Sequence, residues 1–245
     1  MKNLKNKLKK YSLKDAIYFE NQDRQFLALK KLSLSLQFSL PYREKEAAKI
    51  SNFLFLIIAN SLICYQLSGK GEDYWEEFSE FFENKTFKNF QEFFELFENF
   101  LAKTKNNKRF IETKLKRIKK LENFYNSKKD FENYYKNMKK LALDLSKIMN
   151  QKIEAKTIVF AVKMFSYWAR NTFNYLEYFP ENLMIPIDSR LEKLFEKYNN
   201  SSSNSKKNKQ EIKTFYINLS KKLKIPLLHL DAILWLNYDD LIEKN

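Results

Sequence analysis

Apolar residues recur every three or four positions along most of this chain, which is the spacing of one face of an α-helix. The pattern predicts helices over residues 3–20, 22–38, 44–67, 72–83, 87–103, 108–125, 130–148, 157–173, 189–198, 211–223 and 228–242. The segment 44–67 is apolar on nearly all sides after Ser51, so we expect it at the centre of the fold. Asn60 and Ser61 break its apolar run, which is therefore too short to span a bilayer.

The composition supports a helical protein. The 245 residues include only two glycines and four prolines. Because turns between strands depend on these residues, a sheet-rich fold is excluded and we predict an all-α fold. The polar, low-complexity segment 199–210 is predicted to be a mobile loop.

The formal net charge is +15, and it is unevenly distributed. Residues 1–71 carry +8 and residues 101–147 carry +10, whereas residues 72–98 carry −7. A basic region of this kind favours a polyanionic partner such as nucleic acid, with an affinity that falls as salt is added. The alternative is a soluble, self-repelling surface from a lysine-rich proteome.

Several kinds of site are excluded by counts alone. Cys64 and His229 are the only cysteine and histidine. An internal disulfide, an iron–sulfur cluster, a Cys₄ zinc site and a multi-histidine metal site are therefore ruled out, and we expect no cofactor. No phosphate-binding glycine loop is present. No apolar core follows the basic N-terminus, so we expect an intracellular protein without a signal peptide.

Two lysines interrupt the otherwise apolar helical segment 154–168. Lys156, Phe160, Lys163 and Tyr167 are four, three and four positions apart, so they share one helix face. At the start of a helix, the dipole and any desolvation favour the neutral amine of Lys156 over its charged form. A neutral amine can form a Schiff base with a sugar carbon. The alternative is a lysine that extends into solvent.

Three other polar or aromatic residues allow two interpretations each. Asp188 follows an extended proline segment and precedes a helix, so it is either an N-cap or a carboxylate that stabilises a cation. Asp231 and Trp235 are four positions apart. They could bind an extruded base by hydrogen bonding and stacking, or they belong to the core.

Four segments, in this order, resemble the archaeal 8-oxoguanine DNA glycosylase family, AGOG, which is a branch of the helix-hairpin-helix glycosylases. They are the segment from Tyr65 to Trp75, Lys156 to Lys163, Ile185 to Asp188, and Pro226 to Trp235. The resemblance implies one all-helical glycosylase domain over residues 1–245. It also implies two lobes, about 1–84 plus 187–245 and 85–186, with a cleft between them.

The resemblance also implies an activity and the residues that perform it: removal of 8-oxoguanine from DNA, then strand cleavage by β-elimination at the abasic site. Lys156 matches the family's Schiff-base lysine and Asp188 its catalytic aspartate. Phe160 and Trp235 match the aromatic pair around the extruded base. Gln25, Trp75, Lys163 and Asp231 match residues of the base pocket. The implied substrate is damaged double- or single-stranded DNA, bound by a monomer in the cell interior at the nucleoid.

The chain departs from the family at the hairpin before Lys156, where Asn150 stands near the position of a usual glycine. Asparagine tolerates left-handed backbone better than most residues, so we expect the turn to form. Three alternatives stay open: a glycosylase for another damaged base, a non-catalytic helical nucleic-acid-binding protein, and a protein-interaction bundle that uses residues 72–98.

Overall fold

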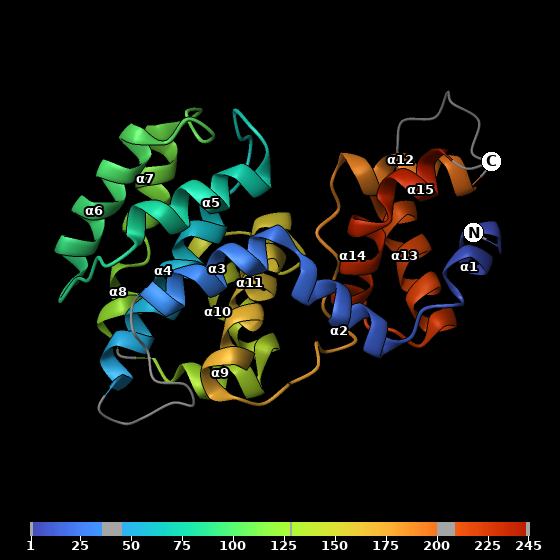
Figure 1. Cartoon of the computed structure of the whole chain (residues 1–245), viewed down its shortest axis with the longest axis horizontal. Helices are drawn as coiled ribbons and strands as arrows, with labels where there is room; N and C mark the ends of the chain where they lie inside the picture. Colours follow the sequence, from blue (N-terminus) through green and yellow to red (C-terminus); the bar gives the residue numbers. More distant parts are fainter. Residues whose placement is uncertain (1, 36–45, 128, 200–208, 244–245) are drawn as a thin grey trace. The chain divides into compact units, whose positions relative to one another are not determined.

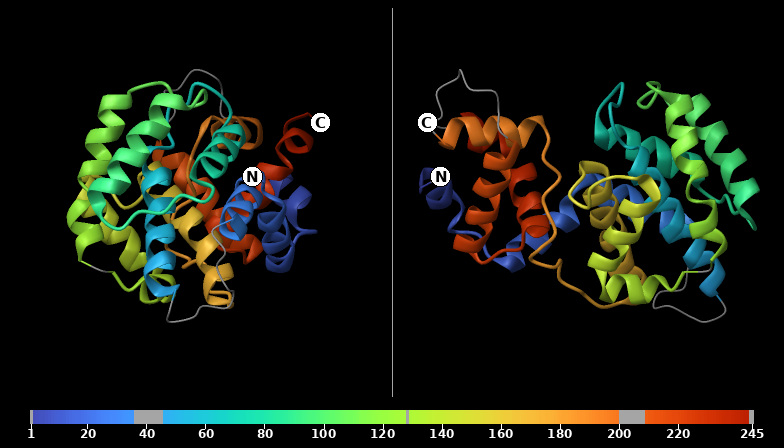
Figure 2. Two further views of the ribbon diagram at one scale, coloured as in Figure 1. Left: turned by 60° about the vertical axis from the view of Figure 1, so that its left-hand side comes forward. Right: turned by 180° about the vertical axis from the view of Figure 1, so that it is seen from behind.

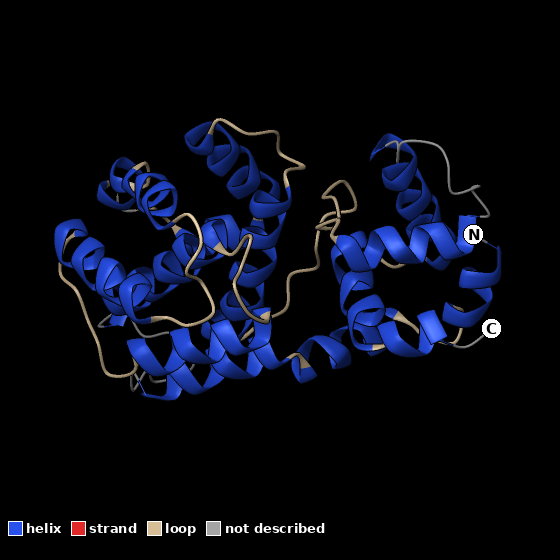
Figure 3. Ribbon diagram, turned by 90° about the horizontal axis from the view of Figure 1, so that it is seen from above, coloured by secondary structure: helices blue, strands red, loops and turns tan. Residues whose placement is uncertain are grey.

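The structure, a computed structural model, describes residues 2–35, 46–127, 129–199 and 209–243. Those residues form helices and connecting loops without a strand, as Figure 1 and Figure 3 show. The helices are α1 (Lys2–Leu8), α2 (Leu13–Gln22), α3 (Arg24–Ser35), α4 (Ala47–Ile63), α5 (Gly71–Phe82), α6 (Phe90–Lys103), α7 (Ile111–Lys119), α8 (Glu122–Asn126), α9 (Phe131–Lys136), α10 (Met138–Met149), α11 (Lys156–Phe173), α12 (Ser189–Asn199), α13 (Lys209–Leu223), α14 (Leu227–Leu236) and α15 (Tyr238–Glu243). The predicted all-α fold is confirmed.

Some predicted helices are divided in the structure, because polar side chains bond to the backbone at the division. Ser12 and Asp15 form a capping box that starts α2 after a break in the predicted helix 3–20. Asn137 interrupts the predicted helix 130–148, and its side-chain oxygen accepts a hydrogen bond from the Lys140 amide at the start of α10. The predicted helix 228–242 is divided into α14 and α15 at Asn237, whose side chain donates to the Ile233 carbonyl at 2.9 Å. The predicted helix 108–125 becomes α7 and α8 without such a side-chain bond.

The chain forms two compact units. The terminal unit contains Met1–Asp23 and Tyr178–Asn245, and the central unit contains Arg24–Glu177. The lobes expected from the sequence divide after residues 84 and 186 instead. Residues 24–84 belong with the rest of the central unit because α3 and α4 pack on α11 and α4 also packs on α7.

Two further predictions concern membrane-spanning helices and the loop 199–210. Within the described residues, no helix is long and apolar enough to cross a membrane. Residues 200–208 of the predicted loop 199–210 lie outside the described residues, while Asn199 ends α12 and Lys209 begins α13.

The core of the central unit is built on α4 and α11, with α9 and α10 also packed on α11 (Figure 2). The rings of Phe53 on α4 and Trp168 on α11 meet edge to face at 4.9 Å. Buried aromatic residues extend the core across α4, α5 and α6: Phe55, Tyr74, Trp75, Phe78, Phe82, Phe93, Phe97 and Phe100. Each buried phenylalanine contributes about 1.5–3 kcal/mol relative to an exposed one, so these rings hold the layer together.

In the terminal unit, α2 packs on α14, and a buried histidine joins them. Nδ1 of His229 lies 2.7 Å from a carboxylate oxygen of Glu20, and the Phe179 amide donates to Nε2 at 3.2 Å. Since Nε2 accepts a hydrogen bond, the imidazole is neutral and donates from Nδ1 to Glu20. The only histidine of the chain therefore has a structural role.

Lys114 on α7 is an unusual member of the core of the central unit, because its side chain is 0% exposed. Its ammonium group donates to the Asn107 side chain and lies 5.0 Å from the centre of the Tyr65 ring. No carboxylate pairs with it among the described residues. Burial consequently lowers the pKa of Lys114 from its ordinary value of 10.5 to about 8.

The lowered pKa of Lys114 predicts a rise of stability in alkali. Between pH 8 and 10.5 the unfolded chain binds more protons at this position, so the free energy of unfolding should increase with pH by up to about 3 kcal/mol. Lys114→Met removes this contribution, and urea unfolding of both proteins across the window measures it. Lys116→Met, at an exposed position of the same helix, is the control. Parallel pH profiles for wild type and Lys114→Met would contradict the prediction.

Candidate active site

A hairpin between α10 and α11 places Lys156 at the start of a helix. The hairpin begins at Asn150, whose backbone is left-handed with φ 50° and ψ 52°. Its amide donates to Lys147, and the Gln151 amide donates to Ser146 at 2.9 Å, which satisfies the last carbonyls of α10. The turn therefore forms without glycine, as expected from the tolerance of asparagine for this conformation.

Lys156 is the first residue of α11, and its side chain is exposed. Desolvation, which the sequence analysis invoked to favour a neutral amine, is therefore not seen at this residue. The neighbouring residue Thr157 is held by Arg117 of α7, whose guanidinium donates to the Thr157 hydroxyl at 2.8 Å and to the Gln151 side chain at 2.7 Å. Arg117 also donates to the carbonyl of Leu62 at the end of α4, at 3.0 Å.

Cys64, just after α4, is the other nucleophilic group near Lys156. Burial raises the pKa of the Cys64 thiol to about 12, although the positive charges of Lys156 and Lys114 act in the opposite direction. A thiol that stays protonated is a poor nucleophile. Lys156 therefore has no thiolate competitor at Cys64.

The face of α11 that carries Lys156 continues toward α5 and α3. Phe160 lies with its ring centre 6.2 Å from that of Trp75, edge to face. Lys163 is 3% exposed, and its ammonium group lies 5.3 Å from the centre of the Tyr167 ring. The Tyr167 ring in turn meets Phe26 of α3 at 5.8 Å.

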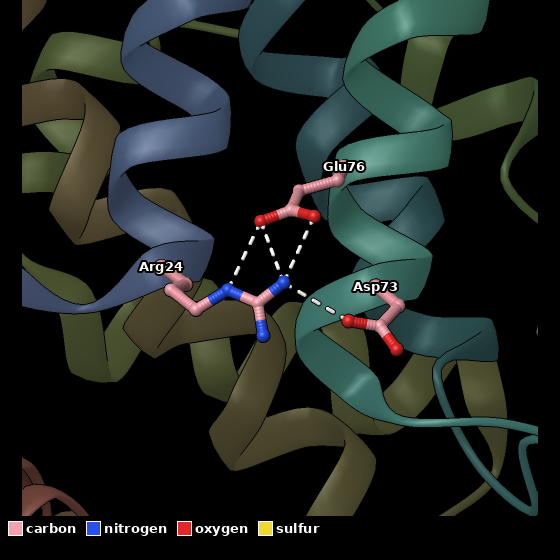
Figure 4. A network of polar contacts seen from close by, with 3 residues as sticks. All are labelled: Arg24, Asp73 and Glu76. Atoms are coloured by element: carbon pink, nitrogen blue, oxygen red, sulfur yellow. Dashed lines mark hydrogen bonds and ion pairs between the residues drawn. The ribbon is translucent and has the colours of Figure 1, made fainter.

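Gln25 and Trp75 lie on two helices that an ion-pair network joins. Figure 4 shows Arg24 of α3 donating to Asp73 of α5 at 2.9 Å and to both carboxylate oxygens of Glu76 at 2.8 and 2.9 Å. Next to this network, the side chain of Gln25 is buried against Gly71, where a Cβ would lie only 3.3 Å from Nε2. The absence of a side chain at Gly71 lets α5 begin beside this amide.

In the terminal unit, Asp188 is the N-cap of α12. Its Oδ1 accepts hydrogen bonds from the amides of Arg190 and Leu191, at 3.0 and 3.1 Å. The second carboxylate oxygen has no hydrogen-bond partner among the described residues. The capping interpretation is confirmed, and it leaves one oxygen of a half-buried carboxylate available for other chemistry.

Asp231 and Trp235 lie one helical turn apart on α14. Asp231 is buried, and its negative charge together with that of Asp188 and burial raises the pKa of Tyr216, so both carboxylates lie near this phenol. The Arg190 guanidinium lies 3.7 Å from the centre of a Trp235 ring. Arg190 thus covers one face of the indole, and a base could stack only on the other face.

The eight site residues predicted from the sequence therefore fall into two sets. The central unit brings together Gln25, Trp75, Phe160 and Lys163, with Lys156 on the same helix as the last two. The terminal unit brings together Asp188, Asp231 and Trp235. The pairings of Lys156 with Asp188 and of Phe160 with Trp235 stay predictions. Among the described residues, no group of three or more His, Cys, Asp or Glu side chains could hold a metal ion.

Sequence reasoning missed two arginines that lie next to these sets. Arg117 lies in a run of basic residues. Nothing in the sequence around it indicates that it binds Thr157, which is 40 positions away. Arg190 follows Asp188 by two positions, but its stacking on Trp235 depends on the packing of α12 and α14 with α15.

Comparison with known proteins identifies the family. A sequence model of the AGOG family, described as N-glycosylase/DNA lyase, matches residues 5–245. The chain belongs to the AGOG family. This family consists of DNA glycosylases that also act as lyases at the abasic site, and DNA is accordingly their substrate.

Individual members of the AGOG family match this chain over most of its length. An N-glycosylase/DNA lyase from Methanococcus maripaludis is 42% identical over 185 residues, which is 75% of this chain and 69% of the relative. One from Nanoarchaeum equitans is 36% identical over 230 residues, 93% of this chain and 86% of the relative. The crystal structure of Pa-AGOG, an 8-oxoguanine DNA glycosylase from Pyrobaculum aerophilum, in complex with 8-oxoguanosine shares the fold with a TM-score of 0.78. It is 22% identical, and the match covers 97% of this chain and 87% of that one.

The Arg117 contacts predict that this residue fixes the first turn of α11. Arg117→Gln should lower the free energy of unfolding by about 2 kcal/mol, because charged hydrogen bonds of this kind contribute about 1.5–3 kcal/mol. It should also speed hydrogen exchange of the amides of residues 157–160 relative to the middle of α11. Urea unfolding and mass-spectrometric exchange measure the two effects. Lys116→Gln on α7 is the control, and exchange unchanged in Arg117→Gln would refute the assignment.

Proposed function

We propose that this enzyme removes 8-oxoguanine from DNA and then cleaves the strand at the abasic site through a Schiff base on Lys156. The observation that carries the proposal is the position of Lys156. It is an exposed amine at the first residue of the helix that follows the hairpin, within a chain that matches the AGOG family along its length. The choice of 8-oxoguanine follows the relative Pa-AGOG, whose structure contains 8-oxoguanosine.

In the proposed reaction, the nitrogen of Lys156 forms a bond to C1′ of the damaged nucleotide while the glycosidic bond breaks. The base leaves with the bonding electron pair. The new ammonium loses a proton, which Asp188 accepts through its uncapped oxygen and the departing base takes up. The sugar ring then opens to an imine, loss of a C2′ proton expels the 3′ phosphate, and hydrolysis releases Lys156.

The remaining site residues are assigned to base recognition. Phe160 and Trp235 replace the stacking that the extruded base loses, and Trp75 supports the Phe160 ring from behind. Relative to guanine, 8-oxoguanine has a proton at N7 and a carbonyl at C8. Gln25, Lys163 and Asp231 are buried polar side chains of the types that can read this edge.

This mechanism uses groups from both units. It needs no metal or cofactor, because the amine supplies the nucleophile and the carboxylate handles the proton. We also propose that the enzyme acts as a monomer at the nucleoid, on damaged DNA in double- or single-stranded form. Cleavage of oligonucleotides that carry 8-oxoguanine, uracil or an abasic site distinguishes this substrate from another damaged base.

Lys156→Gln tests the nucleophile. Without the amine, borohydride should no longer trap a covalent complex with 8-oxoguanine duplex, while DNA affinity should fall by no more than about tenfold because only one positive charge is lost. Denaturing gels measure trapping, and fluorescence anisotropy measures affinity. Lys152→Gln, an exposed lysine of the same hairpin, is the control and should keep trapping. A trapped complex of Lys156→Gln would show that another amine reacts.

Asp188→Asn tests the carboxylate separately from the cap. Asparagine also accepts hydrogen bonds at an N-cap, so the fold should persist. Base release should fall about a hundredfold or more because the amide accepts no proton. Single-turnover release of 8-oxoguanine and the melting temperature are measured together. Asp130→Asn, the same change at the N-cap of α9, is the matched control. Equal release rates for the two variants would reduce Asp188 to a cap.

A further inference from the structure

Phe110, immediately before α7, combines two features that are unfavourable for folding. Its backbone is left-handed, with φ 58° and ψ 37°, and its side chain is 56% exposed. The left-handed region is strained for bulky residues, and three of the other described positive-φ positions carry asparagine, which tolerates it. They are Asn84, Asn150 and Asn174. Phe110 therefore exposes an aromatic ring from a backbone position where asparagine or glycine would be more stable.

The loop that carries Phe110 is rigidly attached to the central unit. The Glu77 carboxylate of α5 accepts hydrogen bonds from the Thr104 hydroxyl and from the amides of Lys105 and Asn106, both at 3.2 Å. On the other side, the Ser68 hydroxyl donates to the Lys105 carbonyl at 2.9 Å and accepts from the Lys108 amide at 3.1 Å. A ring held by such a loop loses little conformational freedom when it binds a partner.

The same loop is joined to the segment that leads to the base pocket. The Asn106 carbonyl accepts from the amides of Ser68 and Gly69, at 2.8 and 3.3 Å. A Cβ at Gly69 would lie 1.7 Å from the Asn106 side chain, so any larger residue would displace that side chain. Two residues later Gly71 begins α5, which carries Trp75. Hydrogen bonds thus connect the loop to the segment that begins α5.

Charge indicates what the ring contacts. The residues directly before Phe110, Lys108 and Arg109, are both exposed, as is Lys105. None of these three forms an ion pair among the described residues. An exposed aromatic ring beside free cations is the arrangement that binds nucleic acid, because the cations contact phosphates and the ring stacks on a base.

We infer that Phe110 stacks on a nucleobase of the DNA next to the damaged nucleotide, while Lys108 and Arg109 bind the adjoining phosphates. The inference rests on the proposed function only in taking DNA as the ligand. It adds a contact outside the base pocket, supplied by a loop that no site residue occupies. This role would explain the strained backbone at Phe110, because that backbone leaves the ring exposed.

The test measures stability and DNA affinity together. If the ring binds DNA, replacing it should lower the affinity without lowering the stability. Phe110→Asn and Phe110→Gly relieve the left-handed strain, so their melting temperatures should equal or exceed that of wild type. Both should bind a fluorescein-labelled duplex with a tetrahydrofuran abasic analogue at least fivefold more weakly, as loss of one stacked base predicts. Phe110→Trp keeps an aromatic ring and should keep the wild-type affinity.

Controls separate the ring from the backbone and the charges. Asn84→Gly changes another exposed left-handed position without an aromatic ring and should leave the affinity unchanged. Lys108→Gln and Arg109→Gln should each reduce the slope of log affinity against log salt by about one, whereas Phe110→Asn should not alter the slope.

Two outcomes would overturn the inference. Wild-type affinity in Phe110→Asn and Phe110→Gly would show that the ring does not touch DNA. A melting temperature lowered in both variants, in step with affinity, would assign the ring a structural role. Failure of the proposed function has a different signature: wild type would bind the duplex with Phe110-dependent affinity but form no borohydride-trapped complex with 8-oxoguanine DNA.

Discussion

The packing of α11 against α4, α3 and α5 is the constraint on which the candidate site depends. Trp168 contacts Phe53 of α4, while Phe160 and Tyr167 contact Trp75 of α5 and Phe26 of α3. Because α11 is a continuous helix, seven residues separate Lys156 from Lys163 by about 10 Å along its axis. The backbone positions of Lys156 and of the buried Lys163 therefore keep a fixed separation.

The start of this helix is held by different means from its middle. The first turn of α11 has no buried large side chain before Ile158, and Ala155 provides no side-chain cap. Arg117 supplies the missing attachment by binding Thr157, Gln151 and the end of α4 through one guanidinium. The planar fork of arginine makes this possible, since lysine could not donate in three fixed directions. An exposed amine at Lys156 is thus carried on a fixed backbone.

The helices and the chemistry of this protein follow from its sequence, whereas the contacts between distant segments do not. Periodicity predicts α4, α5 and α11 because their apolar residues repeat along one stretch of chain. It does not predict the break at Asn137, where one polar side chain outcompetes the helix locally. The lobe boundaries that the family resemblance implies also differ from the compact units, since the packing of α4 on α11 joins helices that are far apart in the sequence. The Lys156 and Asp188 motifs are visible as local patterns, but the capping bonds of Asp188 and the Arg190 stack on Trp235 depend on the folded unit.

The acidic segment 72–98 is reconciled with a DNA-binding protein by the way its charges are used. Asp73 and Glu76 pair with Arg24, and Glu77 accepts from the loop that carries Lys105. These carboxylates satisfy a cation and backbone amides of the protein itself. The neighbouring lysines and arginines of the loop and of α7 remain exposed in several cases, as at Lys108 and Arg109. These acids are thus held by Arg24 and by backbone amides, which leaves Lys108 and Arg109 without an ion-pair partner among the described residues.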